Sequence, residues 1–169
     1  MENDKFPKRK QIRLKEYNYS ANGAYFVTVC TKDKKHLFWE KNETNVGANC
    51  VRPYEYQLSH TGCIVDKEIK GIDNIYGDIV KIDKYVIMPN HIHMIIIIDD
   101  FDSGRTQFAP TVSRIIKQFK GAVTKKTGIS LWQKSFYDHI IRNCNDYLEI
   151  WNYIDSNPLK WADDEYYSD

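Results

Sequence analysis

The sequence predicts an α+β fold with a mainly antiparallel central sheet and helices packed on it. Residues 24–31 read AYFVTVCT, a run of β-branched and aromatic side chains that is typical of a strand. Residues 80–88 and 91–99 are two further strand-like runs, and the dipeptide Pro89-Asn90 between them is typical of a tight turn. Apolar residues at helical spacing separate or follow these strands, which favours a sheet covered by helices.

Two helices are expected around the strand pair. The first spans residues 61–76, with Thr61 or Ser59 as its cap. Its apolar side consists of Ile64, Val65, Ile69, Ile72 and Ile75. Ser113 is expected to cap the second helix, which runs through Lys126, and Gly128 suits its end.

The remaining elements complete the order of the fold. Residues 36–40 extend the first strand or form a short second one, and residues 131–142 are aromatic and extended. Asn143 or Asn145 caps a last helix, which Pro158 stops. The order strand, helix, strand, strand, helix, extended segment, helix fits the sandwich of ferredoxin and RNA-recognition-motif domains.

Composition indicates one soluble domain. The chain has 169 residues, of which 42% are hydrophobic and 28% charged. We interpret residues 1–169 as a single domain with a basic N-terminal arm at 1–20 and a surface loop insertion at 41–55. The longest strongly apolar run is too short to cross a bilayer, and the N-terminus lacks a secretory signal. Scattered cysteines without a C-x-x-C pair favour a cytoplasmic protein with reduced thiols.

Basic side chains are concentrated although the net charge is only +1. Residues 5–15 hold six basic side chains and no acidic one. A second set lies in the predicted helix before Gly128 and consists of Arg114, Lys117, Lys120, Lys125 and Lys126. Solvated surface is the ordinary explanation of such runs, but two clusters in a chain with 14% aromatic residues also favour nucleic-acid binding.

His91 and His93 stand one residue apart at the start of a predicted strand. Side chains alternate between the faces of a strand, so both imidazoles point the same way, roughly 7 Å apart at their Cα atoms. Two neutral imidazoles at this spacing can bind one divalent metal if a third ligand comes from elsewhere. The alternative is that both are hydrogen-bonded histidines of the core or its rim.

The last helix offers partners for such a site. Tyr153 and Asn157 are four residues apart, so they lie on one face of the helix. Asn157 presents a carbonyl oxygen that could complete a two-histidine metal site, and Tyr153 presents a phenol that could attack a phosphodiester. The alternative is that Tyr153 packs in the core and Asn157 caps the helix before Pro158.

Five blocks of sequence stand out together: NGAYFVTVCTKDKKHLF, YVIMPNHIHMIIII, IIKQFKGAVTK, LWQKSFYDHIIR and YIDSNP. In combination they resemble the REP-associated tyrosine transposases, which belong to the single-tyrosine HUH transposases. They run in family order over roughly residues 10–160. The resemblance implies that His91 and His93 are metal ligands, that Tyr153 is the nucleophile and that Asn157 is the further polar ligand. Tyr137, which precedes the last helix, is the rival nucleophile.

The resemblance also implies chemistry on single-stranded or hairpin DNA. The tyrosine would attack a phosphorus atom and form a 5′-phosphotyrosine link, with Mg²⁺ or Mn²⁺ polarising the phosphate. The candidates for DNA contact are Lys8, Arg9, Lys10, Arg13, Lys117, Lys120 and Arg142. A salt bridge is the other explanation for Arg142. Relatives include intertwined dimers and monomers, which leaves a homodimer open.

Two other functions are compatible with the same residues. The chain could be a catalytically silent derivative that only binds hairpin or repeat DNA. It could also be an RNA-binding sheet, but that function calls for exposed aromatic side chains on the central strands. The segments YVIM and MIIII are mostly aliphatic and better suited to burial.

Overall fold

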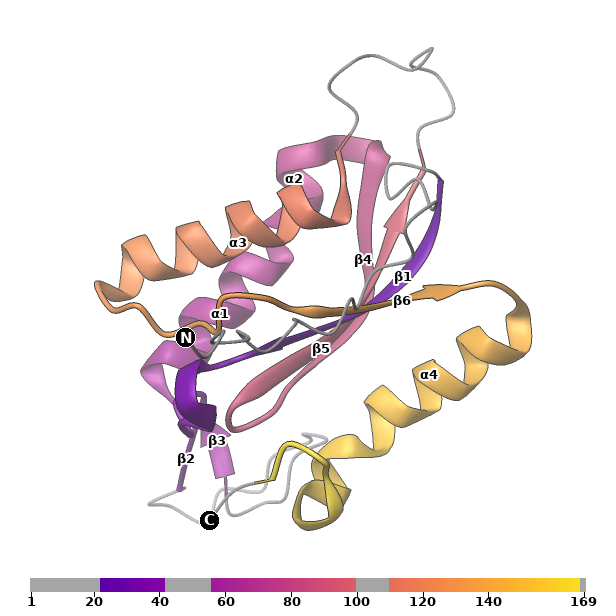
Figure 1. Cartoon of the computed structure of the whole chain (residues 1–169). Coiled ribbons are helices and arrows are strands. Elements are labelled where there is room, and N and C mark those ends of the chain that lie inside the picture. The colour runs from indigo at the N-terminus through magenta and orange to yellow at the C-terminus, as the bar shows by residue number, and fades with distance from the viewer. Residues whose placement is uncertain (1–21, 42–55, 100–109, 168–169) are drawn as a thin grey trace, which may run out of the picture.

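The computed structural model describes residues 22–41, 56–99 and 110–167. A four-stranded antiparallel sheet with the strand order β4-β5-β1-β6 forms its centre, and this confirms the predicted α+β class (Figure 1). The strands are β1 (Gly23–Cys30), β2 (Trp39–Lys41), β3 (Tyr56–Leu58), β4 (Val80–Ile87), β5 (His91–Ile98) and β6 (Tyr137–Ile141). The α-helices are α1 (His60–Lys70), α2 (Ile72–Tyr76), α3 (Val112–Thr127) and α4 (Cys144–Ser156). The 3₁₀ helices are η1 (Lys32–Lys34), η2 (Gly77–Ile79) and η3 (Asn157–Asp163).

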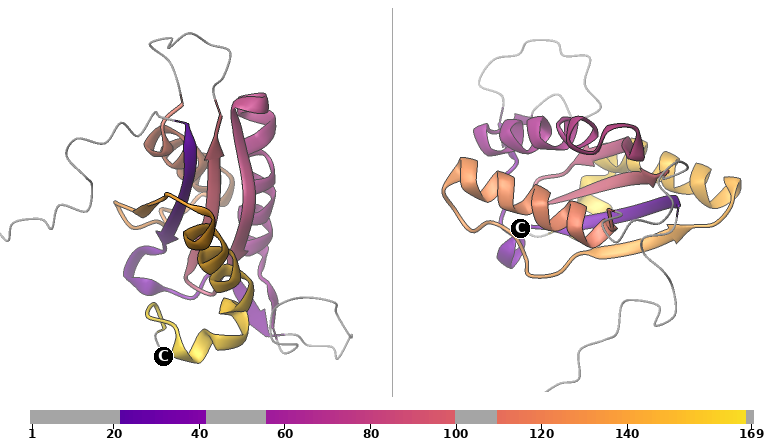
Figure 2. Two further views of the ribbon diagram at one scale, coloured as in Figure 1. Left: turned by 90° about the vertical axis from the view of Figure 1, so that its right-hand side faces the viewer. Right: turned by 90° about the horizontal axis from the view of Figure 1, so that it is seen from above.

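The two faces of the sheet carry different helices (Figures 1 and 2). On one face, Val27 of β1 and Met94 of β5 belong to the main core together with Val65 of α1 and Phe119 of α3. On the opposite face a smaller cluster joins Phe26 and Ile95 to Ile154 of α4. The chain order β1-α1-β4-β5-α3-β6, with both crossover helices on one face, is the predicted ferredoxin-like arrangement, and α4 is an addition on the other face.

Alternation along β5 explains this division. Ile92, Met94, Ile96 and Ile98 point to the face of α1 and α3, so His91, His93 and Ile95 point to the face of α4. In the register, Cys30 of β1 is opposite His91 and Thr28 is opposite His93. Thr28 is also opposite Tyr137 of β6. One face of three neighbouring strands therefore brings the histidine pair, Thr28 and Tyr137 together.

Two of the predicted helix boundaries need correction. The first helix is interrupted at Gly71 and begins at His60, one residue before the predicted start. Of its two predicted caps, Ser59 is confirmed, since its hydroxyl accepts a hydrogen bond from the Gly62 amide. For α3, Thr111 is the cap instead of Ser113, and its side chain accepts a hydrogen bond from the Arg114 amide. The predicted end of α3 is confirmed, since Gly128 adopts a left-handed conformation with φ 72°.

A second, two-stranded sheet pairs β2, which confirms the predicted short strand near residues 36–40, with β3, which the sequence does not predict. Lys41, assigned to the loop insertion from the sequence, ends β2 and pairs with Tyr56 of β3. The rest of the predicted insertion lies outside the described residues, as does the N-terminal arm. Within the described segments, no helix has both the length and the apolar character that crossing a membrane requires.

Candidate active site

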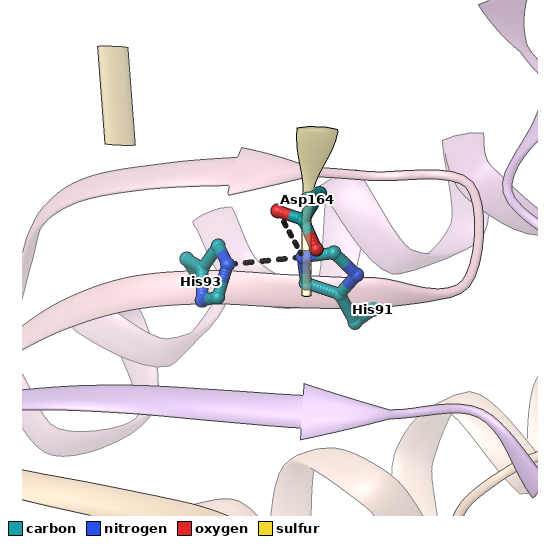
Figure 3. A group of neighbouring side chains, drawn as sticks. All are labelled: His91, His93 and Asp164. Carbon is teal, nitrogen blue, oxygen red and sulfur yellow. Dashed lines mark hydrogen bonds and ion pairs between the residues drawn. The ribbon is translucent and has the colours of Figure 1, made fainter. Parts of the chain in front are cut away.

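The two histidines lie side by side at the start of β5 (Figure 3). His91 is 0% exposed and His93 is 1% exposed, and their Nε2 atoms are 2.9 Å apart. Both side chains face α4 and the C-terminal segment that follows it, since the ring of His93 lies 5.1 Å from that of Tyr153 and the ring of His91 lies 4.6 Å from that of Tyr166. The predicted convergence of the two imidazoles is therefore present.

The other ring nitrogen of each histidine is held by a neighbouring side chain. His91 Nδ1 is 2.9 Å from Asn90 Oδ1, and His93 Nδ1 is 2.9 Å from Thr28 Oγ1. An amide oxygen only accepts hydrogen bonds, so His91 Nδ1 donates to it. A neutral His91 then has no proton on Nε2, and this lone pair points toward His93.

Burial keeps both histidines neutral at physiological pH. Desolvation lowers the pKa of His93 to about 3. The pKa of His91 is lowered well below its usual value, first by desolvation and then by the charges of His93 and Lys34. Neutral imidazole is the form that binds metals, so neither ring has to lose a positive charge before a metal binds.

Asp164 brings a carboxylate to the same point (Figure 3). It follows η3, and its Oδ2 lies 3.9 Å from His91 Nε2. One ligand atom from each of His91, His93 and Asp164 lies within 4.8 Å of the other two. The Asp164 side chain is only 2% exposed, and its second oxygen accepts a hydrogen bond from the Tyr166 amide.

Tyr153 and Asn157 come from the end of α4, as the sequence predicts. The Tyr153 hydroxyl is 3.2 Å from His93 Nε2, and its side chain is 39% exposed, so it does not pack in the core. Asn157 is the C-cap residue of α4 and is only 4% exposed. Its Oδ1 is buried and has no hydrogen-bond partner in the part of the chain that the structure describes. A buried amide oxygen of this kind is costly unless something binds it.

The surroundings of Tyr153 favour its protonated form. Burial and then the charge of Asp164 raise its pKa to about 12, although a hydrogen bond from the Asn157 side chain acts in the opposite direction. The phenol is therefore neutral at physiological pH. A positive charge near the hydroxyl would favour the phenolate.

A cavity of about 670 Å³ opens in front of these groups. Tyr137 and Tyr153 both line it, with 46% and 39% of their side chains exposed. The cavity also contains Lys160 and three acidic residues, Asp163, Asp164 and Glu165. The two candidate nucleophiles thus share one space, but only Tyr153 has a hydrogen bond to a histidine among the contacts that the structure gives.

The basic candidates occupy other positions. Lys8, Arg9, Lys10 and Arg13 lie outside the described residues. Lys117 is exposed on α3, across the sheet from α4. Lys120 donates hydrogen bonds to the carbonyl oxygens of Gln133 and Ser135, both at 2.9 Å, so it connects α3 to the segment before β6. Arg142 is exposed, and its backbone amide donates a hydrogen bond to the carboxylate of Asp146.

Sequence reasoning missed Asp164 and Asn90. Asp164 lies in the acidic C-terminal stretch, 71 residues after His93, and no spacing pattern connects it to the histidines. Asn90 was assigned only to the turn, although an amide directly before a ligating histidine is a recognisable partner for its Nδ1.

The residues fit a divalent metal. Two imidazole nitrogens, a carboxylate and an unpartnered amide oxygen form a mixed nitrogen and oxygen donor set that suits Mn²⁺ and related ions. The His-His-Asp group is therefore compatible with a divalent metal site.

Comparison with known proteins finds relatives in sequence and a solved structure with the same fold. An uncharacterized protein of Haemophilus influenzae is 36% identical over 180 aligned positions, which cover 95% of this chain and 94% of that protein. The REP-associated tyrosine transposase of Escherichia coli K12 is 35% identical over 80 residues, which cover 47% of this chain and 45% of that protein. A solved REP-associated tyrosine transposase bound to a REP hairpin superposes with a TM-score of 0.62 and 22% identity, covering 88% of this chain and 74% of that one.

Over about half of its length the chain is similar to REP-associated tyrosine transposases, and it shares the fold of a solved one. No family model matches it. The alignment with the Escherichia coli transposase spans about half the length of that protein, whereas the structural likeness extends over most of this chain and shows that the fold is shared. In this shared fold the histidine pair and the α4 tyrosine lie on the same face of the sheet.

Proposed function

We propose that this chain is a metal-dependent single-stranded DNA endonuclease and strand transferase that acts on hairpin DNA. The observation that carries the proposal is the 3.2 Å contact between the Tyr153 hydroxyl and Nε2 of a buried, neutral His93. The contact brings the phenol oxygen next to the nitrogen that would hold the metal, so nucleophile and metal would act on the same phosphate.

His91, His93 and Asp164 would hold the metal, and the unpartnered Oδ1 of Asn157 offers a further oxygen. Mg²⁺ or Mn²⁺ bound there would supply Lewis acidity toward a phosphate oxygen. Asn90 and Thr28 would keep the ligating nitrogens oriented through the hydrogen bonds that they make to Nδ1 of each ring.

Tyr153 would carry the covalent step. Its oxygen loses a proton and forms a bond to phosphorus, and the bond from phosphorus to the 3′ oxygen breaks. The departing 3′ oxygen takes up a proton and becomes a hydroxyl, and the 5′ phosphate stays on Tyr153. Attack by a 3′ hydroxyl reverses these changes and joins the ends. No external energy source is required, because one phosphodiester is exchanged for another.

Hairpin DNA is the proposed substrate. The solved relative is bound to a REP hairpin, and the fold that it shares with this chain supports the same class of ligand. Lys8, Arg9, Lys10 and Arg13 remain candidates for contact with the DNA backbone, together with Lys117 and Arg142. Lys120 is less suited because its ammonium group already donates to two carbonyl oxygens.

The test is a denaturing-gel assay with labelled hairpin DNA from the regions that flank the gene. The wild-type protein with Mn²⁺ or Mg²⁺ is expected to give a cut strand and a protein-linked DNA band. The Tyr153→Phe variant should lose both, since the phenol oxygen is the attacking atom. The Tyr137→Phe variant is the matched control, because Tyr137 lines the same cavity, and it should keep both products.

Other outcomes would change the assignment. Loss of the adduct in Tyr137→Phe alone would make Tyr137 the nucleophile. Retarded hairpin DNA that remains uncut with every metal would support a derivative that binds repeat DNA without cutting it.

A further inference from the structure

We propose that a second cavity, lined by aromatic rings next to the histidine pair, binds one unpaired nucleobase of the DNA. The inference rests on the proposed function, because that function brings single-stranded DNA to the neighbouring cavity. The proposed function places a DNA phosphate in the cavity of Tyr153, and the second cavity adds a binding site for a base. Its position predicts that the base lies close to the cleaved phosphodiester along the strand.

The cavity has a volume of about 380 Å³. Four separate segments of the chain form its walls: the stretch from η1 to β2, the start of β3, the turn between β4 and β5, and the C-terminal segment. The aromatic residues that line it are His36, Trp39, Tyr56, Trp161 and Tyr167. Pocket volumes for small ligands start at about 300 Å³, so this space suits a single ring system and its sugar better than several stacked nucleotides.

The rings stand in contact with one another. Trp161 is 5.5 Å from His36 and 5.2 Å from Tyr167 between ring centroids, and the plane of His36 is tilted 71° from that of Trp161. Trp39 and Tyr56 form another pair at 5.6 Å. Stacking between aromatic side chains and bases is the main way in which proteins hold unpaired nucleotides without reading their sequence.

Hydrogen bonds hold these walls against the turn that carries the histidines. The indole nitrogen of Trp39 donates to the Ile87 carbonyl at 2.7 Å. Pro89, which also lines the cavity, accepts hydrogen bonds from the amides of Leu37 and Phe38 through its carbonyl oxygen. The pocket wall and the start of β5 therefore form one connected unit.

Trp161 connects the two cavities. Its ring lies 6.0 Å from that of His91 and 5.5 Å from that of His36. Lys160, the residue before it, lines the cavity of Tyr153. The Trp161 ring therefore lies beside the histidine pair on the side of the aromatic cavity, and the residue before it reaches the cavity of Tyr153.

The two cavities differ in the charged side chains that line them. The cavity of Tyr153 contains Asp163, Asp164 and Glu165, whereas none of the described residues that line the aromatic cavity is acidic. Lys35 and Lys160 are exposed and directly precede His36 and Trp161 in the chain. This arrangement favours a neutral, flat group inside the pocket and backbone phosphates at its margin.

The test is an abasic scan in metal-free buffer, where binding is measured without cleavage. A labelled hairpin with single-stranded flanks is prepared with one abasic position at a time, and its affinity for the wild-type protein is measured by fluorescence anisotropy. One flank position, or two adjacent ones, should be sensitive, with a loss of roughly 5- to 150-fold in affinity, and the other flank positions should be insensitive.

The Trp161→Ala variant should weaken binding of the intact hairpin by a similar factor and should no longer distinguish the sensitive abasic DNA from intact DNA. Trp161→Phe retains a ring and should restore part of the discrimination. Trp151→Ala is the matched control. Trp151 is a half-buried tryptophan of α4, and the ammonium group of Lys84 lies 3.7 Å from the centroid of its ring. Because Trp151 does not line the aromatic cavity, its variant should show the same abasic profile as the wild type.

The outcomes separate this inference from the proposed function. A flat abasic profile in a wild-type protein that binds the hairpin overturns the pocket, even if the DNA is cut when metal is added. A sensitive position that persists in Trp161→Ala also overturns it. A sensitive position that depends on Trp161 supports the pocket, even if no phosphotyrosine adduct forms, which would count against the catalytic proposal alone. Failure of the wild-type protein to bind hairpin or single-stranded DNA overturns both.

Discussion

Asn90 connects the histidine pair to two other segments of the chain. Its Oδ1 accepts from His91 Nδ1, while its Nδ2 donates to the carbonyl oxygens of Lys34 and Tyr166 at 3.2 and 2.9 Å. Only 1% of its surface is exposed, so all three hydrogen bonds are shielded from water. This single side chain therefore fixes the tautomer of His91 and holds η1 and the C-terminal segment against the turn.

We expect Asn90→Ala to weaken Mn²⁺ binding by about 10- to 100-fold, as is typical when the partner of a ligating histidine is removed. The physical reason is that His91 Nδ1 loses its acceptor, so the tautomer with a free Nε2 is no longer favoured. Isothermal titration calorimetry with Mn²⁺ measures the effect. Asn90→Asp keeps an acceptor oxygen and should retain most of the affinity. Equal affinities for wild type and Asn90→Ala would rule out this positioning role.

Asp164 and Asn157 both offer an oxygen as the third metal ligand beside the two histidines. Asp164→Ala should weaken Mn²⁺ binding more than Asn157→Ala does, because it removes a charged oxygen that lies 3.9 Å from His91 Nε2. Asp163→Ala is the matched control, since Asp163 lines the same cavity but does not belong to the group that can hold a metal. The same titration measures all three variants. An unchanged affinity in Asp164→Ala with a large loss in Asn157→Ala would make Asn157 the principal oxygen ligand.

At the scale of elements, α4 matters because it carries Tyr153. Its first turn is stabilised by Asn143, whose side-chain oxygen accepts a hydrogen bond from the Asp146 amide at 2.9 Å. His139 of β6 contacts both carboxylate oxygens of Asp146, at 3.1 and 3.0 Å. These contacts hold the start of α4 at the edge of the sheet. The C-terminal end of α4, which carries Tyr153, then lies beside His93.

We expect Asn143→Ala to lower the free energy of unfolding by about 1 kcal/mol, the usual effect of removing an N-cap side chain. Urea denaturation followed by circular dichroism measures it. Asn145→Ala provides the control, because Asn145 is exposed within the first turn and is not the cap. If both variants lost the same stability, the cap assignment would be wrong.

Local patterns predicted the elements well and their ends less well. The strands around Pro89-Asn90 follow from an apolar pattern and a turn signal that both lie within a few residues. Thr111 and Ser113 are equally good caps by residue type, and only the packing of Val112 into the core decides between them. The strand at Tyr56–Leu58 has no strong pattern of its own, and its pairing with β2 is what defines it.

The candidate site shows the same limit at the level of the whole molecule. His91 and His93 are recognisable because two residues of one strand carry the signal, and Tyr153 and Asn157 because one helical turn does. Asp164 reaches the histidines only after η3 reverses the chain beyond α4 (Figure 1). That reversal depends on tertiary contacts such as the one between Tyr166 and His91, which no local spacing records.

A metal at the histidine pair would join β5 to the C-terminal segment, and the stability of the whole domain should respond to it. A ligand that binds only the folded state stabilises it by about 2.7 kcal/mol when its concentration is about 100 times its Kd. For a domain of this size, this corresponds to a rise of roughly 5–11 °C in the unfolding midpoint. Differential scanning calorimetry with and without Mn²⁺ measures the rise, and chelation by EDTA should reverse it.

The variants locate the origin of this stabilisation. His91→Ala should lose the Mn²⁺-dependent rise, because it removes a ligand that is buried between Asn90 and Asp164. His139→Ala is the matched control, since His139 pairs with Asp146 and does not belong to the metal-binding group, so its rise should equal that of the wild type. A rise of the same size in His91→Ala would mean that Mn²⁺ binds elsewhere on the chain. The two-histidine site would then have to be rejected as the metal centre, whatever the DNA-cutting assay shows.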